Sequence, residues 1–242
     1  MSADRAIAWE GFYNVRDLGG LPTVDGQRTK RARVYRSAAL SLATRAGWEA
    51  AYAAGVRTIV SLLNDDEVAA VGARQEVAPQ QISHVRVPLD AVEDVPLWDQ
   101  IAAEGRDGTP LYYSLLLGRH PERAADAVRA ITQAEPGAVL FHCGAGRDRT
   151  GLVAALLLVL ADVTVDAVIE DYEQSAVVQS ALDAALGRPS QQPLVEMALR
   201  ARGRTARSAM QEFLDEVDVP ELLLRGGLTD GELAAACARL RH

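Results

Sequence analysis

The segment H-C-G-A-G-R-D-R-T-G, residues 142–151, brings a thiol, two arginines and three glycines together. It follows an apolar run at 138–141 and precedes a helical pattern that begins at residue 152, so we expect it to join a strand end to a helix start. A helix N-terminus presents unpaired backbone N–H groups and a partial positive charge, which together form an anion site. Gly144 and Gly146 are expected to let the backbone fold tightly enough for successive N–H groups to converge on one point.

Cys143 and Arg149 are the candidate catalytic pair of this segment. A thiol attacks as its thiolate, and cations and a helix N-terminus both favour that ionised form. Arg149 can return across the loop and bind two phosphate oxygens with its planar guanidinium group. Because phosphoryl transfer needs little beyond positioning and charge stabilisation, we predict that Cys143 attacks phosphorus. The predicted phosphate-binding residues are Gly144, Ala145, Gly146, Arg147, Asp148 and Arg149.

Two neighbours of this pair have predicted supporting roles. The Thr150 hydroxyl could hydrogen-bond the Cys143 sulfur and ease its departure, and His142 could orient the loop through its ring N–H groups. A lone buried cysteine is more often an inert small hydrophobe, and a lone histidine at a strand end is more often a core residue. The pattern H-C-x-x-G-x-x-R-S/T would arise by chance on the order of once in ten thousand such chains, so the functional interpretation is preferred.

The leaving oxygen needs a proton as its bond to phosphorus breaks, which requires an acid within hydrogen-bond reach. Asp148 is one candidate, although a carboxylate inside the loop could instead orient Arg147 or the loop backbone. Asp90 is the other, because it ends V-R-V-P-L-D (85–90) at the exit of a predicted strand, where strand ends should gather near Cys143. Asp90 could also be a turn residue; of the two, it is the preferred acid.

The rest of the chain predicts an α/β architecture, because short apolar runs alternate with helical patterns. The predicted strands are 34–36, 56–63, 82–87 and 138–141, and the predicted helices among them are 44–54, 65–74 and 121–134. After residue 151 the strand pattern ends, and helices are predicted around 152–161, 164–173, 177–186, 192–202, 206–217 and 229–240. The expected fold is a single α/β domain over residues 1–242 with a helical C-terminal third.

The segment 88–110 has two interpretations, a surface connection with one short helix or a loop beside the active site. A phosphotyrosine site needs a deep slot lined by an aromatic side chain. Leu97-Trp98 or Tyr112-Tyr113 could supply that side chain, and the sequence does not place them.

Composition excludes several classes of function. Hydrophobic residues make up 49% and charged residues 24% of the 242 residues, as in globular proteins, and the formal net charge is −8. That charge argues against a nucleic-acid partner or a stable membrane association. The most apolar stretch, 152–161, is half of the about twenty residues that span a bilayer, and residues 1–17 have no signal-peptide pattern.

Cys143 and Cys237 are the two cysteines of the chain, and they lie far apart. This spacing is neither a disulfide framework nor a zinc site. A free thiol survives in a reducing compartment, so a cytoplasmic location is expected. We expect no metal and no cofactor, and the oligomeric state stays open.

The loop resembles the C-x5-R-S/T signature of protein-tyrosine and dual-specificity phosphatases. More narrowly, it is similar to a bacterial tyrosine-phosphatase-like family of atypical dual- or triple-specificity enzymes, whose loop reads H-C-x-x-G-K-D-R-T-G. N-V-R-D-L-G-G (14–20), V-Y-R-S-A-A-L (34–40) and G-V-R-T-I-V-S-L (55–62) resemble further motifs of that family, in order and spacing, so the resemblance covers most of residues 10–175. Arg147 departs from it, because the family has there a lysine that is associated with phosphoinositide binding.

This resemblance implies a dual-specificity-phosphatase-like fold, in which helices flank a central sheet, and a reaction through a phosphocysteine intermediate. It implies that the acid lies at the strand end that carries Asp90. It also implies a helical lid over the site, here at 176–205, for which an ordinary helical cap is the alternative.

Charged clusters elsewhere are expected to be structural. Arg36 is set apart because it lies in the family-like motif 34–40, whereas Arg16 and Asp17 are expected to form a structural pair. The run of Arg28, Lys30, Arg31 and Arg33 is expected to be a solvated face. A second run could be a solvated face or could attract a second anionic group of the substrate; it consists of Arg200, Arg202, Arg204 and Arg207.

The sequence therefore predicts a cysteine-dependent phosphomonoester hydrolase that acts on phosphotyrosine and phosphoserine proteins. The main alternative is a phosphatase of a small metabolite, such as a sugar or nucleoside phosphate. Below these rank a phosphoinositide phosphatase, which the acidic net charge disfavours, and a phosphate-binding pseudophosphatase. The presence of both Cys143 and Arg149 counts against the latter.

Overall fold

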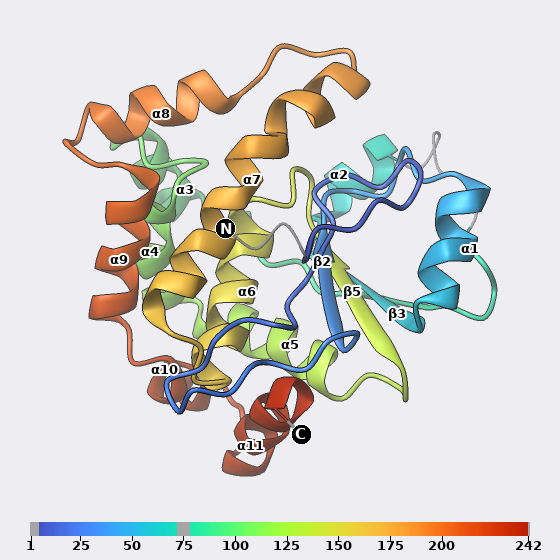
Figure 1. The fold of residues 1–242 in the computed structure, drawn as a ribbon. Coiled ribbons are helices and arrows are strands. Elements are labelled where there is room, and N and C mark those ends of the chain that lie inside the picture. Colours follow the sequence, from blue (N-terminus) through green and yellow to red (C-terminus); the bar gives the residue numbers. More distant parts are fainter. Residues whose placement is uncertain (1–4, 72–77, 242) are drawn as a thin grey trace.

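A computed structural model describes residues 5–71 and 78–241, and within them a five-stranded sheet forms the centre of the fold (Figure 1). The strands are β1 (Arg16–Asp17), β2 (Val34–Ser37), β3 (Val56–Ser61), β4 (Ser83–Arg86) and β5 (Ala138–His142). Their order is β1-β2-β5-β3-β4; β1 is antiparallel to β2 and the other neighbours are parallel. All residues of the central β5 are buried, as its continuous apolar run predicts for a strand covered on both faces.

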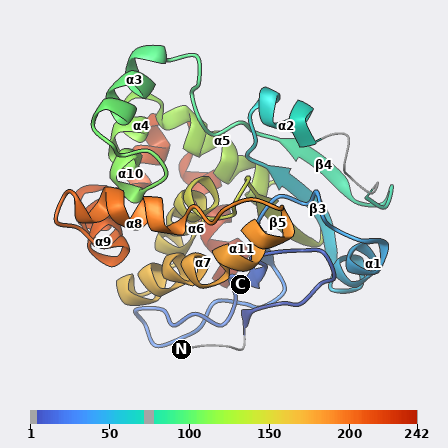
Figure 2. The same cartoon turned by 90° about the horizontal axis from the view of Figure 1, so that it is seen from above.

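Helices cover both faces of the sheet, as seen along two directions in Figures 1 and 2. On one face α1 (Arg45–Ala53) packs on β3, and its Trp48 joins a core cluster with Tyr35 and Leu140. On the other face α5 (Pro121–Thr132) and α6 (Asp148–Leu160) contact the sheet. Most of α6 is buried, which explains its apolar sequence. The α/β prediction is confirmed.

The C-terminal third is helical, as predicted. It contains α7 (Val165–Ala185), α8 (Gln192–Arg200), α9 (Ala206–Glu216), α10 (Val219–Arg225) and α11 (Asp230–Arg241). The remaining helices are α2 (Asp65–Val71), α3 (Val95–Ala103) and α4 (Tyr113–Arg119), with a 3₁₀ turn, η2, at Pro110–Tyr112. Helix α7 packs along α6 and also contacts α8 and α9, and α9 contacts η2. The helices after the Cys143 segment therefore return to the residues that follow α3.

The structure corrects several sequence predictions. The predicted helices 164–173 and 177–186 are one continuous helix, α7, because the polar Ser175 between them is buried and accepts a hydrogen bond from Arg16. Helices α4 and α10 and the short β1 were not predicted. The four predicted strands are present within two residues of their expected bounds. Residues 72–74 of the predicted helix 65–74 lie outside the described residues.

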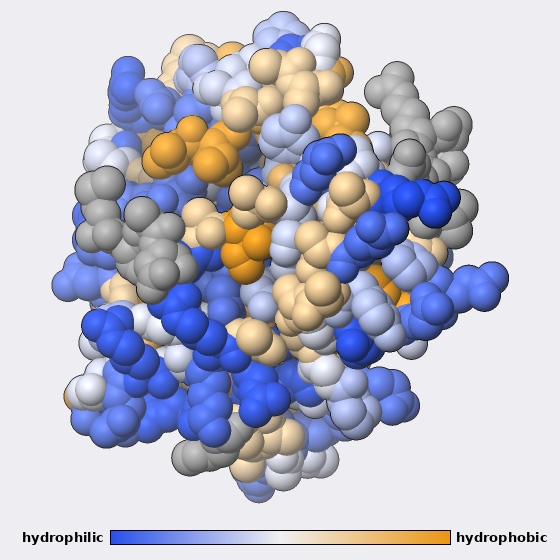
Figure 3. Space-filling view, turned by 45° about the vertical axis from the view of Figure 1, so that its right-hand side comes forward, coloured by the Kyte–Doolittle hydropathy of each residue, from blue (hydrophilic) through white to orange (hydrophobic). Residues whose placement is uncertain are grey.

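Polar and apolar residues are interspersed on the face drawn in Figure 3. The exposed basic runs around residues 28–33 and 200–207 lie on the surface as expected. In the part of the chain that the structure describes, no helix has both the length and the apolar character needed to cross a bilayer.

Candidate active site

The loop of residues 143–147, which we call the Cys143 loop, connects the end of β5 to the first turn of α6. Gly146 has a φ of +68°, and a Cβ at this position would collide with the Ser37 carbonyl oxygen. Only glycine fits there. At Gly144, by contrast, a Cβ would meet no atom closer than 3.8 Å. The expectation that both glycines are needed for the turn therefore holds for Gly146 and not for Gly144.

Three carbonyl groups of the Cys143 loop, those of residues 144–146, accept hydrogen bonds from other segments of the chain. Ala39 N–H donates to the Gly144 carbonyl over 3.0 Å. Asn14 Nδ2 donates to the carbonyls of Ala145 and Gly146 over 3.1 and 3.0 Å. In a trans peptide the C=O and the next N–H point in opposite directions, so the N–H groups of residues 145–147 point away from these donors. A row of N–H groups that share one direction is the arrangement that an anion site requires.

Cys143 is only 2% exposed and stands at the start of this loop. Thr150, in the first turn of α6, is fully buried, and its hydroxyl has no hydrogen-bond partner. His142 lies one residue before the thiol, with Nδ1 3.3 Å from the Cys143 carbonyl oxygen. Burial lowers the pKa of His142 to about 4, so its imidazole is neutral at physiological pH.

Arg149 is held by a residue that the sequence analysis missed. Glu67 of α2 accepts from both terminal nitrogens of Arg149, with Nη2 2.6 Å from Oε1. Glu67 also accepts from the Asn64 N–H over 2.9 Å. Although burial would lower the pKa of Arg149, Glu67 and the other nearby anions raise it well above its usual range. The guanidinium group is therefore permanently charged and fixed in orientation.

Asp90 lies against the same guanidinium, with Oδ2 3.3 Å from Arg149 Nε. The Asp90 side chain is nine-tenths buried, and Oδ1 has no hydrogen-bond partner. Burial raises the pKa of Asp90 to about 6, with Arg149 opposing the shift and Glu67 adding to it. A carboxyl group with this pKa can donate a proton near neutral pH.

A cavity of about 200 Å³, the catalytic cavity, opens above Arg149 between the strand ends and α3. Its walls include Asp90, Trp98, Tyr112 and Asp148. The rings of Trp98 and Tyr112 lie 5.8 Å apart between centroids. Both aromatic segments that the sequence left open thus contribute a side chain. The segment 88–110 lies beside the candidate site, and it also contains α3 with its Asp94 cap.

Asp148 lines the catalytic cavity too, but its carboxylate is occupied. It accepts from Arg147 Nε over 3.2 Å and from Nη2 over 3.0 Å, and Tyr172 donates to it over 3.3 Å. Arg147 in turn donates to the Gly108 carbonyl over 3.2 Å. This arrangement agrees with the alternative in which the Asp148 carboxylate orients Arg147.

A buried ion cluster lies beneath the Cys143 loop. Asp171 of α7 accepts from Arg16 Nε over 2.9 Å, from Arg36 Nη1 over 2.6 Å and from Arg5 Nη2 over 2.8 Å. Although burial favours the neutral acid, the three arginines hold the pKa of Asp171 well below its usual range. Arg36 Nη2 also donates to the Gly146 carbonyl over 2.8 Å. The cluster therefore ties α7 to the loop, and its net positive charge favours an anion above it.

This cluster corrects the predicted pairing of Arg16 with Asp17, and it explains why Arg36 differs from the basic residues before it. Arg16 does not pair with Asp17, whose carboxylate instead accepts from the N–H groups of Gly19 and Ala32 over 2.8 Å each. Arg36 was set apart from its exposed basic neighbours, and it is completely buried.

Three comparisons relate this chain to known proteins. A protein of Cupriavidus necator that carries the provisional name of tyrosine-protein phosphatase is 31% identical over 176 residues, which span 70% of this chain and 62% of that protein. The tyrosine-protein phosphatase of Nostoc commune is 33% identical over 144 residues, which span 58% of this chain and 47% of that protein. The chain thus spans less than two thirds of either relative.

Among solved structures, the crystal structure of P. aeruginosa TpbA in complex with pTyr aligns with a TM-score of 0.42 and 19% identity, over 81% of this chain and 87% of that one. The model of the tyrosine phosphatase family matches residues 7–233, nearly the whole chain. On the strength of that match, this chain belongs to the tyrosine phosphatase family.

Proposed function

We propose that this protein hydrolyses phosphomonoesters on tyrosine and serine residues of proteins through a phosphocysteine intermediate. The observation that carries the proposal is the contact between Asp90 and Arg149 at the N-terminus of α6, the helix that the Cys143 loop precedes. Asp90 Oδ2 lies 3.3 Å from Arg149 Nε, and Arg149 lies six residues after Cys143 in the sequence, just beyond the loop. An anion cradle, a fixed guanidinium and a carboxyl group of raised pKa are what a two-step phosphoryl transfer requires.

In the proposed first step the Cys143 sulfur attacks phosphorus while the backbone N–H groups and Arg149 bind the equatorial oxygens. The ester oxygen departs with a proton from Asp90, and a P–S bond forms. In the second step Asp90 takes a proton from water as the water oxygen attacks phosphorus, which releases inorganic phosphate and the Cys143 thiolate. The Thr150 hydroxyl would donate to the departing sulfur, and its lack of another partner supports this role.

Two features of the catalytic cavity support an aromatic phosphoester. Trp98 and Tyr112 present ring surface against which a phenyl group can pack. Asp107, whose carboxylate also lines the cavity, would repel a second phosphate group. A cytoplasmic location completes the proposal, because the reaction needs a free thiol and both Cys143 and Cys237 are free.

A substrate panel tests this proposal. Turnover of phosphotyrosine peptides should exceed that of sugar and nucleoside phosphates by about a hundredfold in kcat/KM, because the aromatic walls of the cavity offer packing surface for a phenyl ring. The rates are to be measured by phosphate release from each class at matched ionic strength. A higher kcat/KM for a sugar or nucleoside phosphate would favour the metabolite phosphatase instead.

The pH dependence follows from the raised pKa of Asp90. Protonated Asp90 is the acid of the first step, so kcat/KM should fall as pH rises through about 6. The fall should be steep for phosphate esters of basic leaving groups. Because a phosphate ester also ionises with a pKa of about 6, the Asp90→Asn variant is the control: it should lose this alkaline limb and keep the substrate's own titration. An unchanged alkaline limb in the variant would show that another group donates the proton.

A further inference from the structure

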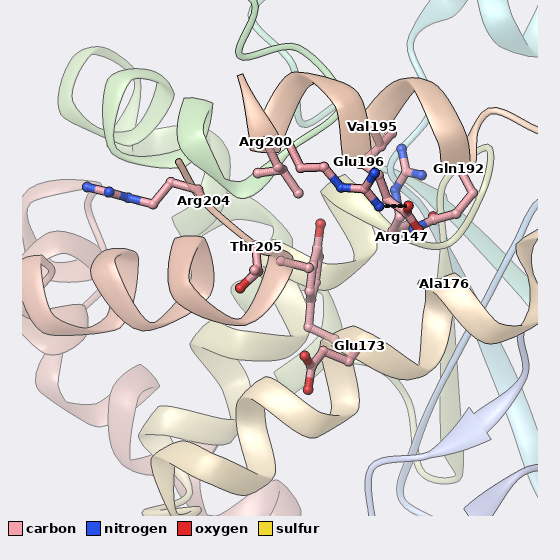
Figure 4. A pocket seen from close by; sticks show the side chains of 12 residues that line it. Arg147, Glu173, Ala176, Gln192, Val195, Glu196, Arg200, Arg204 and Thr205 are labelled. Atoms are coloured by element: carbon pink, nitrogen blue, oxygen red, sulfur yellow. Dashed lines mark hydrogen bonds and ion pairs between the residues drawn. The ribbon is translucent and has the colours of Figure 1, made fainter. Parts of the chain in front are cut away.

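A second cavity of about 390 Å³, which we call the α7–α8 cavity, lies beside the Cys143 loop (Figure 4). It is bounded by the middle of α7, by α8 and by the start of α9. No step of the proposed reaction uses it.

The two cavities share a wall. Arg147 lines the α7–α8 cavity, Asp148 lines the catalytic cavity, and their side chains form an ion pair of 3.0 Å. The Gly108 carbonyl, which accepts from Arg147, belongs to a residue of the catalytic cavity. Val195 of α8 also reaches this point, since its Cγ2 would lie 3.9 Å from a Cβ built on Gly108. A substrate that occupies the catalytic cavity therefore has the α7–α8 cavity as its neighbour.

Each charged side chain that lines the α7–α8 cavity has an ion-pair partner. Arg200 pairs with Glu196 over 2.8 Å, and Figure 4 shows this pair within α8. Glu173 pairs with Arg207 over 3.1 Å. The Arg204 side chain points away from Arg147 in Figure 4 and pairs with Glu212 over 2.6 Å. With Arg147 already matched by Asp148, the cavity offers no surplus positive charge to a second phosphate group.

Between these pairs the walls are apolar, formed by Ala176, Val195, Leu199 and Ala206. Two residues that line the cavity each have a buried polar atom without a partner: the Arg147 Nη1 donor and the Gln192 Oε1 acceptor. Arg147 is only 5% exposed, and Gln192 is fixed because its Nε2 donates to Glu196 over 3.2 Å. Buried polar atoms without partners are costly and point to an occupant that satisfies them.

We propose, on the basis of the proposed phosphatase function, that the α7–α8 cavity binds the peptide residue next to the phosphorylated residue of a protein substrate. The occupant has an apolar side chain for the apolar walls. Its backbone supplies the two missing hydrogen-bond partners: a C=O that accepts from Arg147 Nη1 and an N–H that donates to Gln192 Oε1. Helix α8 and the adjoining part of the predicted lid, 176–205, thus select among phosphopeptides rather than only cover the site.

The test compares phosphotyrosine peptides that carry leucine or aspartate beside the phosphotyrosine, with p-nitrophenyl phosphate as a substrate that has no peptide. Burial of the leucine should give the wild type a preference of about tenfold or more for the leucine peptide in kcat/KM. Val195→Asp should remove that preference and change p-nitrophenyl phosphate turnover about twofold at most. Ala176→Leu, which fills the cavity with a helix-favouring residue, should do the same.

Leu194→Asp is the matched control, because Leu194 lies on the same helix, is 62% exposed and does not line the cavity; it should behave as the wild type. Equal preference for the two peptides in the wild type would overturn the proposal. A preference for the aspartate peptide, or for a doubly phosphorylated one, would overturn it in favour of an anion site at Arg147. Failure of the proposed function gives a different result from failure of the peptide site alone. In that case p-nitrophenyl phosphate would be hydrolysed while every phosphopeptide stays intact, and the proposed peptide site would be refuted as well.

Discussion

Replacement of Cys143 by serine is expected to reduce kcat by more than about 10⁴-fold for every phosphate ester. A serine hydroxyl is essentially un-ionised near neutral pH, so the nucleophile is lost. The anion cradle should remain, because the loop carbonyls are held by Asn14 and Arg36 and the guanidinium of Arg149 is held by Glu67. Affinity for a phosphopeptide or for inorganic phosphate, measured by calorimetry, should therefore stay within about tenfold of the wild type.

The matched control is Cys237→Ser, which changes the other free thiol, on α11. It should keep wild-type kcat, which would show that the loss belongs to the Cys143 sulfur. Turnover by Cys143→Ser comparable to the wild type would refute covalent catalysis by this residue. Loss of anion binding together with turnover would show instead that the sulfur is needed to form the loop.

Site residues were easiest to predict from the sequence where they lie close together along the chain. The Cys143 loop is a continuous segment, and its position between an apolar strand and an apolar helix can be read directly from neighbouring residues. The position of Asp90 close to Arg149 could be predicted because parallel strands place their carboxyl ends at one edge of the sheet. The raised pKa of Asp90 could not, since it depends on burial and on Arg149, which is distant in sequence.

Ion pairs between residues far apart in the chain were not predicted from the sequence. Glu67 lies 82 residues from Arg149, and it follows two other acids in the first turn of α2 that would have served equally well on sequence grounds. Arg16 was matched to the adjacent Asp17, although its partner Asp171 is 155 residues away. Adjacent strand residues point to opposite faces of the sheet, so neighbours such as Arg16 and Asp17 are poorly placed to pair. That geometric argument could have corrected the assignment.

The predicted break between helices 164–173 and 177–186 was wrong for a related reason. The polar Gln174-Ser175 step resembles a break between two helices when only sequence is considered. In the structure Ser175 is completely buried, and its hydroxyl accepts from Arg16 over 3.0 Å. A polar residue that serves the ion cluster beneath the Cys143 loop thus interrupts the apolar pattern without interrupting the helix.

Asp90→Asn should lower kcat/KM by about 10²–10⁴-fold for alkyl phosphates and phosphotyrosine, whose leaving oxygens need a proton. For p-nitrophenyl phosphate, whose leaving group is a stable anion, the loss should be no more than about tenfold. The structure gives Asp90 the attributes of an acid: burial, a pKa raised to about 6 and a free Oδ1. Asparagine preserves the shape of the side chain but weakens its contact with Arg149. The unfolding temperature of the variant is therefore to be measured as well, so that a loss of stability can be told from a loss of the proton donor.

Asp148→Asn is the comparison that assigns the role. Its carboxylate binds Arg147 and Tyr172, so its loss should affect aryl and alkyl esters alike through the position of the loop. A plot of log kcat/KM against leaving-group pKa distinguishes the two variants, because only loss of the proton donor steepens the slope. If Asp148→Asn steepened it and Asp90→Asn did not, the acid would be Asp148. Asp90 would then serve to position Arg149, the group 3.3 Å from its carboxylate.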